Sequence, residues 1–147
     1  MRANLSRVAL LTMTLAMLTA CPAPYTRIDR QVEAAVAPDF ICLIQRFRGL
    51  TPQRAVHYGV EDTEFGTRHT FNYVLSKTFY IWTFLVKPNG NVVITHSSGV
   101  DNDHPEDLPG IREKMRDVEV IMTGYCGLDD VMSGATERCG GQACHAA

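Results

Sequence analysis

The sequence predicts an α+β domain in which an antiparallel four-stranded sheet is covered on one face by N-terminal and C-terminal helices. Three observations predict this fold. Apolar residues recur at helical spacing before residue 48 and again over residues 108–123. The segment between them is rich in β-branched and aromatic residues. A Lys-Pro-Asn-Gly turn at residues 87–90 joins the two strongest strand patterns as a hairpin.

Two helices are expected before the sheet. Residues 26–36 carry apolar side chains on one helical face, namely Ile28, Val32, Ala35 and Val36. Pro38 ends this helix and suits the first turn of the next one. Residues 38–47 repeat the pattern with Phe40, Leu43, Ile44 and Phe47, and Gly49 is a stop signal.

Four strands are expected next, at residues 54–60, 67–75, 77–88 and 91–98. The third is the strongest, and both of its alternating faces are largely apolar, which indicates a central strand. One face carries Tyr80, Trp82, Phe84 and Val86, and the other carries Phe79, Ile81, Thr83 and Leu85. The second apolar face of the sheet therefore requires cover from the tail, a partner or a membrane.

A polar loop at residues 99–107 leads into the last helix, at residues 108–123. That helix has a continuous apolar stripe made of Ile111, Met115, Val118, Met122 and Tyr125. Asp107 can cap it. We place the folded domain at residues 26–132 and expect residues 133–147 to form an irregular tail that its cysteines hold down.

The N-terminal residues have the pattern of an export signal. Arg2 and Arg7 form a positive segment before an apolar stretch that runs from Val8 to Leu18. The stretch is shorter than the ~20 residues of a transmembrane helix and fits the apolar part of a secretory signal peptide. It ends in Leu18-Thr19-Ala20-Cys21.

This order of residues resembles the lipobox of bacterial lipoproteins. The resemblance implies that residues 1–20 are a signal peptide, that Cys21 receives a diacylglyceryl thioether, and that the new N-terminus is acylated. An ordinary signal peptide and an uncleaved interfacial anchor are the alternatives. Residues 21–25 would then be a short tether to a membrane of the bacterial cell envelope, facing the periplasm. Pro22 stands where Asp favours inner-membrane retention, so the outer membrane is slightly favoured.

The charge composition limits which kinds of partner are expected. Without residues 1–20, which hold two arginines and no acids, the chain has 12 basic and 16 acidic side chains and a net charge of −4. It has no basic tract, so nucleic acid is not an expected partner. The expected partners are the membrane, through the lipid on Cys21, and an unknown envelope protein.

Four cysteines follow Cys21. In an oxidising compartment an even number implies two disulfides, and we favour Cys42–Cys126 with Cys139–Cys144. The other arrangement joins Cys126 to one tail cysteine and Cys42 to the other, because connectivity cannot be deduced from sequence alone. A metal site at Cys139, Cys144 and His145 is disfavoured, because structural zinc sites use two close pairs. We predict no metal and no cofactor.

The densest polar group contains His96, Ser97, Ser98, Asp101, Asp103, His104, Glu106 and Asp107. It could form a cation site or an acid–base pair, but a solvated loop whose acids favour a helix N-terminus is the preferred reading. The candidate binding residues are His96, Asp101, Asp103 and His104, together with Tyr80 and Trp82 if their face lines a groove instead of the core. His57 and His69 are expected at exposed strand positions.

We predict no catalytic residue, since no Gly-x-Ser-x-Gly motif occurs and disulfides would consume the thiols. The sequence thus favours a small envelope lipoprotein that acts as a non-catalytic interaction module. A small-ligand-binding lipoprotein is the first alternative. A metal-dependent or hydrolytic enzyme centred on His96–His104 is the second, less favoured one.

Overall fold

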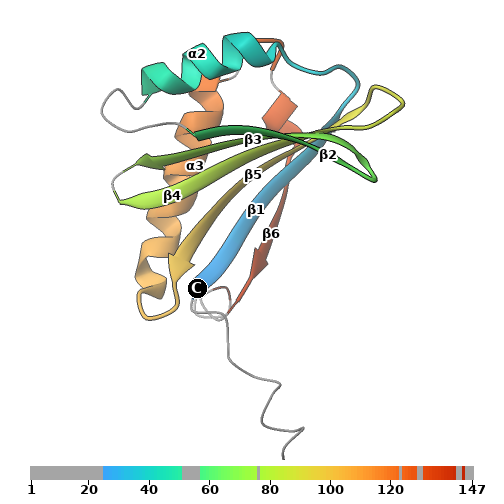
Figure 1. Cartoon of the computed structure of the whole chain (residues 1–147). Coiled ribbons are helices and arrows are strands. Elements are labelled where there is room, and N and C mark those ends of the chain that lie inside the picture. Colours follow the sequence, from blue (N-terminus) through green and yellow to red (C-terminus); the bar gives the residue numbers. More distant parts are fainter. Residues whose placement is uncertain are drawn as a thin grey trace, which may run out of the picture.

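The computed structural model describes residues 25–50, 57–75, 77–122, 124–128, 131–141 and 144. These residues build one six-stranded antiparallel sheet with the strand order β2-β3-β4-β5-β1-β6 (Figure 1). The strands are β1 (Tyr25–Ala34), β2 (His57–Thr63), β3 (Gly66–Leu75), β4 (Thr78–Val86), β5 (Val92–Asp101) and β6 (Thr136–Gly140). The helices are α2 (Phe40–Leu50) and α3 (Leu108–Met122), with single 3-10 turns η1 (Pro105–Asp107) and η2 (Val131–Gly134).

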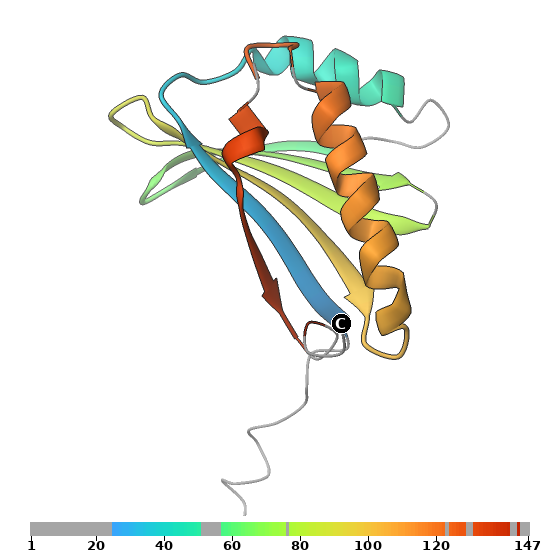
Figure 2. The same cartoon turned by 180° about the vertical axis from the view of Figure 1, so that it is seen from behind.

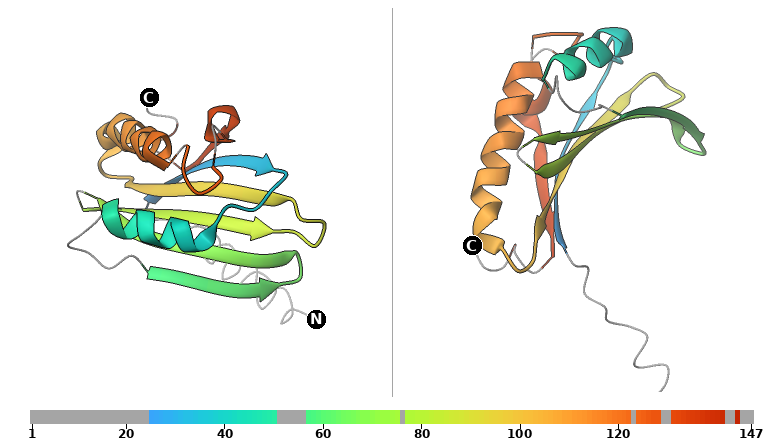
Figure 3. Two further views of the ribbon diagram at one scale, coloured as in Figure 1. Left: turned by 90° about the horizontal axis from the view of Figure 1, so that it is seen from above. Right: turned by 60° about the vertical axis from the view of Figure 1, so that its left-hand side comes forward.

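Both helices lie on the same face of the twisted sheet, and the opposite face is left open (Figures 2 and 3). We call these the helix face and the open face. On β4, Tyr80, Trp82 and Phe84 point to the helix face and are completely buried. Their neighbours Phe79, Ile81, Thr83 and Leu85 point the other way. The apolar residues expected on both faces of this strand are therefore present, but the described helices cover only one of the faces.

Aromatic rings form the part of the core beneath α2. The ring of Phe47 packs against those of Phe71 and Trp82, with centroid distances of 4.8 and 6.0 Å. Leu43 and Phe47 of α2 are completely buried. Beneath α3 the core includes aliphatic side chains, with Ile28 of β1 and Met115 of α3 both fully enclosed. Burial of such side chains contributes about 1.5–3 kcal/mol each, so this face carries most of the hydrophobic stabilisation.

Short-range signals fix the ends of several elements. The Asp39 carboxylate accepts hydrogen bonds from the backbone N–H groups of Ile41 (3.0 Å) and Cys42 (3.1 Å), which caps α2. The turn between β4 and β5 closes with Gly90 at a φ of 88°, as expected of the Asn-Gly pair. Gly124 follows α3 with a φ of 78° and ends it.

The predicted four-stranded sheet with helices at the N-terminal and C-terminal ends is wrong, because the described residues form a sheet of six strands that two α-helices cover. The first error is the helix predicted at residues 26–36, which is strand β1. Arg30 points to the helix face, where it is paired with Glu119, so a charged side chain interrupts the alternation that marks a strand. The remaining apolar residues, Ile28 and Val32, stand four apart and imitate a helical face.

The second error concerns the tail. Residues 136–140 were expected to be irregular, but they pair with β1 as the edge strand β6. The two residues of β6 on the helix face are Glu137, held by an ion pair with Arg112, and Cys139, held by a disulfide. Neither is a typical strand core residue, so the pattern carries no hydrophobic alternation.

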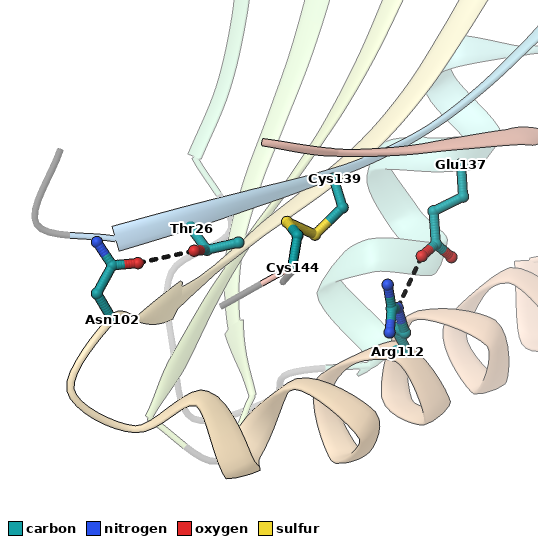
Figure 4. The surroundings of a disulfide bond; sticks show 6 residues. All are labelled: Thr26, Asn102, Arg112, Glu137, Cys139 and Cys144. Carbon is teal, nitrogen blue, oxygen red and sulfur yellow. Dashed lines mark hydrogen bonds and ion pairs between the residues drawn. A yellow bond between two sulfur atoms is a disulfide. The ribbon is translucent and has the colours of Figure 1, made fainter. Parts of the chain in front are cut away.

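Two disulfides join Cys42 to Cys126 and Cys139 to Cys144, the connectivity that the sequence analysis favours. The first, the helix disulfide, links α2 to the turn after α3. The second, the tail disulfide, lies between the end of β6 and the first turns of α3 (Figure 4). Gly141 of this tail passes so close to Thr26 that a side chain would contact the Thr26 backbone. The tail is therefore packed against the start of β1.

Candidate functional site: a buried charge network and an open sheet face

A network of charged and polar side chains lies between α3 and the sheet, with Glu119 at its centre. The single Nε–H of Arg30 donates a bifurcated hydrogen bond to both oxygens of the Glu119 carboxylate, at 2.9 and 3.0 Å, and one of these oxygens contacts His96 Nδ1 at 2.9 Å. The side chain of Glu119 is 5% exposed, that of Arg30 12% and that of His96 0%. An ion pair this deeply buried loses its hydration, and the hydrogen bonds must offset that loss.

The network extends in both directions from Glu119. Toward the core, His96 Nε2 contacts the Tyr73 hydroxyl at 2.9 Å, and Trp82 Nε1 donates to the same hydroxyl at 3.3 Å. Toward the surface, Arg30 approaches Glu137 of β6 at 3.6 Å, and Glu137 accepts from Arg112 Nε at 2.7 Å (Figure 4). This chain of contacts connects the sheet, α3 and the last strand.

Burial controls the protonation of this network. It lowers the pKa of His96, against the opposing effect of the Glu119 carboxylate beside it. Burial also raises the pKa of the Tyr73 hydroxyl far above its ordinary value, so that the group stays protonated. With His96 neutral, one ring nitrogen donates and the other accepts, which matches its two contacts with a carboxylate and a hydroxyl.

The polar group predicted from the sequence is divided by the pleat of β5. His96 points into the core, whereas Ser97 lies on the open face and donates to the Asp29 carboxylate at 2.5 Å. Ser98 donates to the Phe79 carbonyl at 3.1 Å. Neighbouring residues of a strand point to opposite faces, so Ser97 cannot share a site with His96 and Ser98, which lie on the helix face.

The remaining members of the predicted group lie in the exposed turn between β5 and α3. The Asp101 carboxylate accepts from the Asp103 backbone N–H at 3.0 Å, which stabilises the turn. Exposed His104 contacts Glu106 at 3.1 Å, and this hydrogen bond raises the pKa of His104. The structure thus places His96 in the core and His104 in solvent, and it assembles no acid–base pair from them.

The structure also decides between core and groove for Tyr80 and Trp82, and it corrects the position predicted for His69. Tyr80 and Trp82 belong to the core, and the Trp82 ring stacks on His96 at a centroid distance of 4.4 Å. His69 was expected at an exposed position, but it faces α2. Its ring stacks on Phe40 at 3.6 Å, and Nδ1 contacts the Tyr58 hydroxyl at 2.7 Å. Burial lowers the pKa of His69.

The open face carries a band of side chains that no described element covers. Across its middle, β3, β4 and β5 align Thr70, Thr83 and Thr95, and the row continues with Gln31 of β1 and Thr136 of β6. Apolar Ile81, Leu85 and Val93 flank this row, and each is partly exposed. The result is a surface of hydroxyl and aliphatic groups.

A cavity of about 860 Å³ opens at the end of the sheet where β1 begins. The ladder between β4 and β5 ends at Tyr80 and Ser98, although β5 continues to Asp101 alongside β1. The cavity occupies the gap that follows. Its lining includes Arg27, Phe79 and Ile81 from the open face. It also includes residues of the helix face, Ser98 and Val100 of β5 and Ile111 of α3.

Sequence reasoning missed Arg30 and Glu119, the two charged residues at the centre of the network. One signal was present, since Glu119 directly follows Val118 in the apolar stripe of α3 and thus falls near its buried side. Their pairing depends on a contact over 89 residues, which no local pattern reports. Within the described part of the chain, no group of three or more His, Cys, Asp or Glu side chains could hold a metal ion.

Cys21, the predicted lipidation site, lies outside the described residues. Of the helices that the structure describes, none has the length and apolar character needed to cross a membrane. No protein-family model matches the chain, and no curated protein matches it either.

Proposed function

We propose that this chain is a small, lipid-anchored protein of the bacterial cell envelope that binds a partner protein through the open face of its sheet. The observation that carries the proposal is the uncovered face itself. Three aliphatic residues, Ile81, Leu85 and Val93, lie partly exposed in the central strands, where a sheet is normally covered. The lipobox at Cys21 supports the anchor.

The chemistry of the face favours a protein over a charged ligand. Hydroxyl groups of Thr83 and Thr95 alternate with aliphatic groups on β4 and β5, and the ion pairs of this face lie on the strands beside them and in the turn after β4. Exposed Glu61 pairs with Arg68 at 2.7 Å, and Glu33 pairs with Lys87 at 2.8 Å. An apolar centre with a polar rim is the usual anatomy of a protein interface.

The anchor is tested by the intact mass of the mature protein before and after reduction. Acyl groups on Cys21 add the mass of a lipid, and reduction of the two disulfides adds the mass of four hydrogen atoms. The partner surface is tested in cells with a photoreactive residue in place of Thr83 or Thr95. A control position is Lys114, which is exposed on the outer side of α3.

A discrete crosslinked product from both threonine positions, absent from the Lys114 position, is the expected result. The same products from all three positions, or none from Thr83 and Thr95, would contradict the assignment of the open face as a partner surface.

A second candidate function is small-ligand binding, favoured by the cavity at the start of β1. Its volume of about 860 Å³ falls within the ~300–1,000 Å³ range of small-molecule sites. Native mass spectrometry of the purified protein tests this function. A bound molecule that is lost from an Ile81→Trp variant would support it, and a ligand-free spectrum would count against it.

A further inference from the structure

We propose that the end of the sheet that carries Tyr25 and Phe79 rests on the bilayer, so that strand β1 rises away from the membrane. We call this the tether end. The inference rests on the proposed function, because it takes Cys21 as the lipidated residue. It adds the orientation of the domain and names the membrane-contacting side chains, with a zwitterionic lipid surface as the partner.

The first argument is the reach of the tether. Cys21 and Tyr25 are four residues apart, and four extended residues span at most ~14 Å. Strand β1 has 10 residues, which corresponds to a length of ~33 Å. If the opposite end of the sheet faced the membrane, Tyr25 would stand about 33 Å above it, beyond the ~14 Å that the tether can span. The inverted orientation is therefore excluded.

The second argument is the character of the side chains at the tether end. Tyr25 is 54% exposed and Phe79 is 51% exposed, and both lie on the open face at this end. Aromatic rings are favoured at the level of lipid headgroups. Exposed Lys77, in the turn before β4, has an aliphatic stem that can lie along the interface while its amine stays in water.

The charged side chains at the tether end determine which kind of lipid surface it suits. The turn after β5 brings four acidic residues to the tether end, Asp101, Asp103, Glu106 and Asp107. The cations that line the cavity there are Arg27 and Lys77. Two of these acids, Asp101 and Asp107, line the same cavity, so the two cations leave no net positive charge there to attract anionic lipids. The contact depends on the aromatic rings and suits a zwitterionic surface.

The fourth argument distinguishes an upright domain from one that lies flat on its open face. The half of this face far from the tether carries the ion pairs Glu61–Arg68 and Glu33–Lys87. Laying the face on a bilayer would dehydrate these charges, which is costly. An upright domain leaves them in water and leaves the central threonine row free for the proposed partner.

The test places a tryptophan at each end of the sheet. Phe79→Trp probes the tether end, and Phe65→Trp is the matched control, because Phe65 is 62% exposed in the turn at the opposite end of the sheet. The lipidated protein is bound to phosphatidylcholine vesicles whose acyl chains carry bromine, which quenches nearby tryptophan. Trp82 is completely buried, so the unsubstituted protein supplies the background signal.

The expected result is about twofold or stronger quenching at position 79 and none at position 65, as for a side chain inserted a few ångströms into the interface. Tyr25→Trp serves as a second probe if Phe79→Trp does not fold. Equal quenching at positions 79 and 65, or quenching at neither, in lipidated vesicle-bound protein overturns the orientation alone. A purified chain whose mass shows no acyl groups overturns the proposed anchor, and the orientation falls with it.

Discussion

Replacement of Glu119 by leucine should destabilise the protein strongly, because it leaves Arg30 buried without its main partner. Arg30 is 12% exposed and donates a bifurcated hydrogen bond to Glu119, at 2.9 and 3.0 Å. Removing one member of a buried ion pair costs about 3–5 kcal/mol. Glu137, 3.6 Å from Arg30, can still offset part of the charge, so we expect about 3 kcal/mol. For a domain of this size that corresponds to a fall in Tm of about 10 °C.

A double-mutant cycle distinguishes the cost of an unpaired buried charge from the cost of lost packing. Arg30→Met alone should cost a similar amount, because it leaves the Glu119 carboxylate buried. The double variant Arg30→Met/Glu119→Leu should lose about 2–3 kcal/mol less of its free energy of unfolding than the two single variants lose together, because no unpaired charge then remains. His96 still loses its acceptor, which retains a cost of about 1 kcal/mol.

The assay is urea unfolding with the disulfides intact, followed by the fluorescence of Trp82, the one tryptophan in the chain. The control cycle uses Lys87 and Glu33, whose ion pair has a comparable distance of 2.8 Å but side chains that are 34% and 52% exposed. Its coupling energy should stay below about 1 kcal/mol. A coupling between Arg30 and Glu119 no larger than that of the control would refute the reasoning.

Three further predictions concern stability. Removing the helix disulfide should lower the free energy of unfolding by about 4–5 kcal/mol and removing the tail disulfide by about 2 kcal/mol, because their sequence separations are 84 and 5 residues. Equal losses in urea unfolding would argue against this loop-closure explanation. Because burial lowers the pKa of His96, the unfolded chain binds its proton first, so the stability present above about pH 6.5 is lost as the pH falls. Unfolding midpoints between pH 7.5 and 5 should show this slope, and His96→Gln should flatten it. Gly66→Ala should destabilise by more than about 1 kcal/mol, since the φ of Gly66 is 137° and a methyl group would strike the Val86 carbonyl. Gly110→Ala, in open space within α3, should instead stabilise by about 0.5–1 kcal/mol. Thermal melts that ranked these two variants in the opposite order would contradict the prediction.

The parts of the fold that were predicted correctly are those set by short-range signals. The hairpin at residues 87–90 follows from an Asn-Gly pair between two strongly apolar strands, and both α-helices follow from apolar stripes. Strand β1 and the edge strand β6 escaped prediction because distant residues determine them. From the sequence alone, Arg30 and Glu137 are expected to be surface charges. Their partners in the fold, Glu119 and Arg112, are distant in the sequence, so no local pattern indicates that the pairs form.

The candidate site was likewise predictable only in part. The sequence indicated that both faces of β4 are apolar, and thus that one face requires a partner or a pocket. Strand alternation places His96 and Ser97 on opposite faces, but it could not show which of the two faces the helices cover. The pairing of His96 with Trp82 and Arg30 puts it on the covered face. The cavity was not predictable either, because it results from the early end of one strand ladder.

The two disulfides pair the cysteines in the order in which they occur, the first with the second and the third with the fourth after Cys21. For an exported chain that emerges amino end first, this order has a kinetic consequence. Each thiol meets its correct partner as the next one to appear, so stepwise oxidation reaches the native pairing without exchange between mismatched sulfurs. Acylation of Cys21 would protect that sequence of events, because a free thiol there would be the first to compete for Cys42.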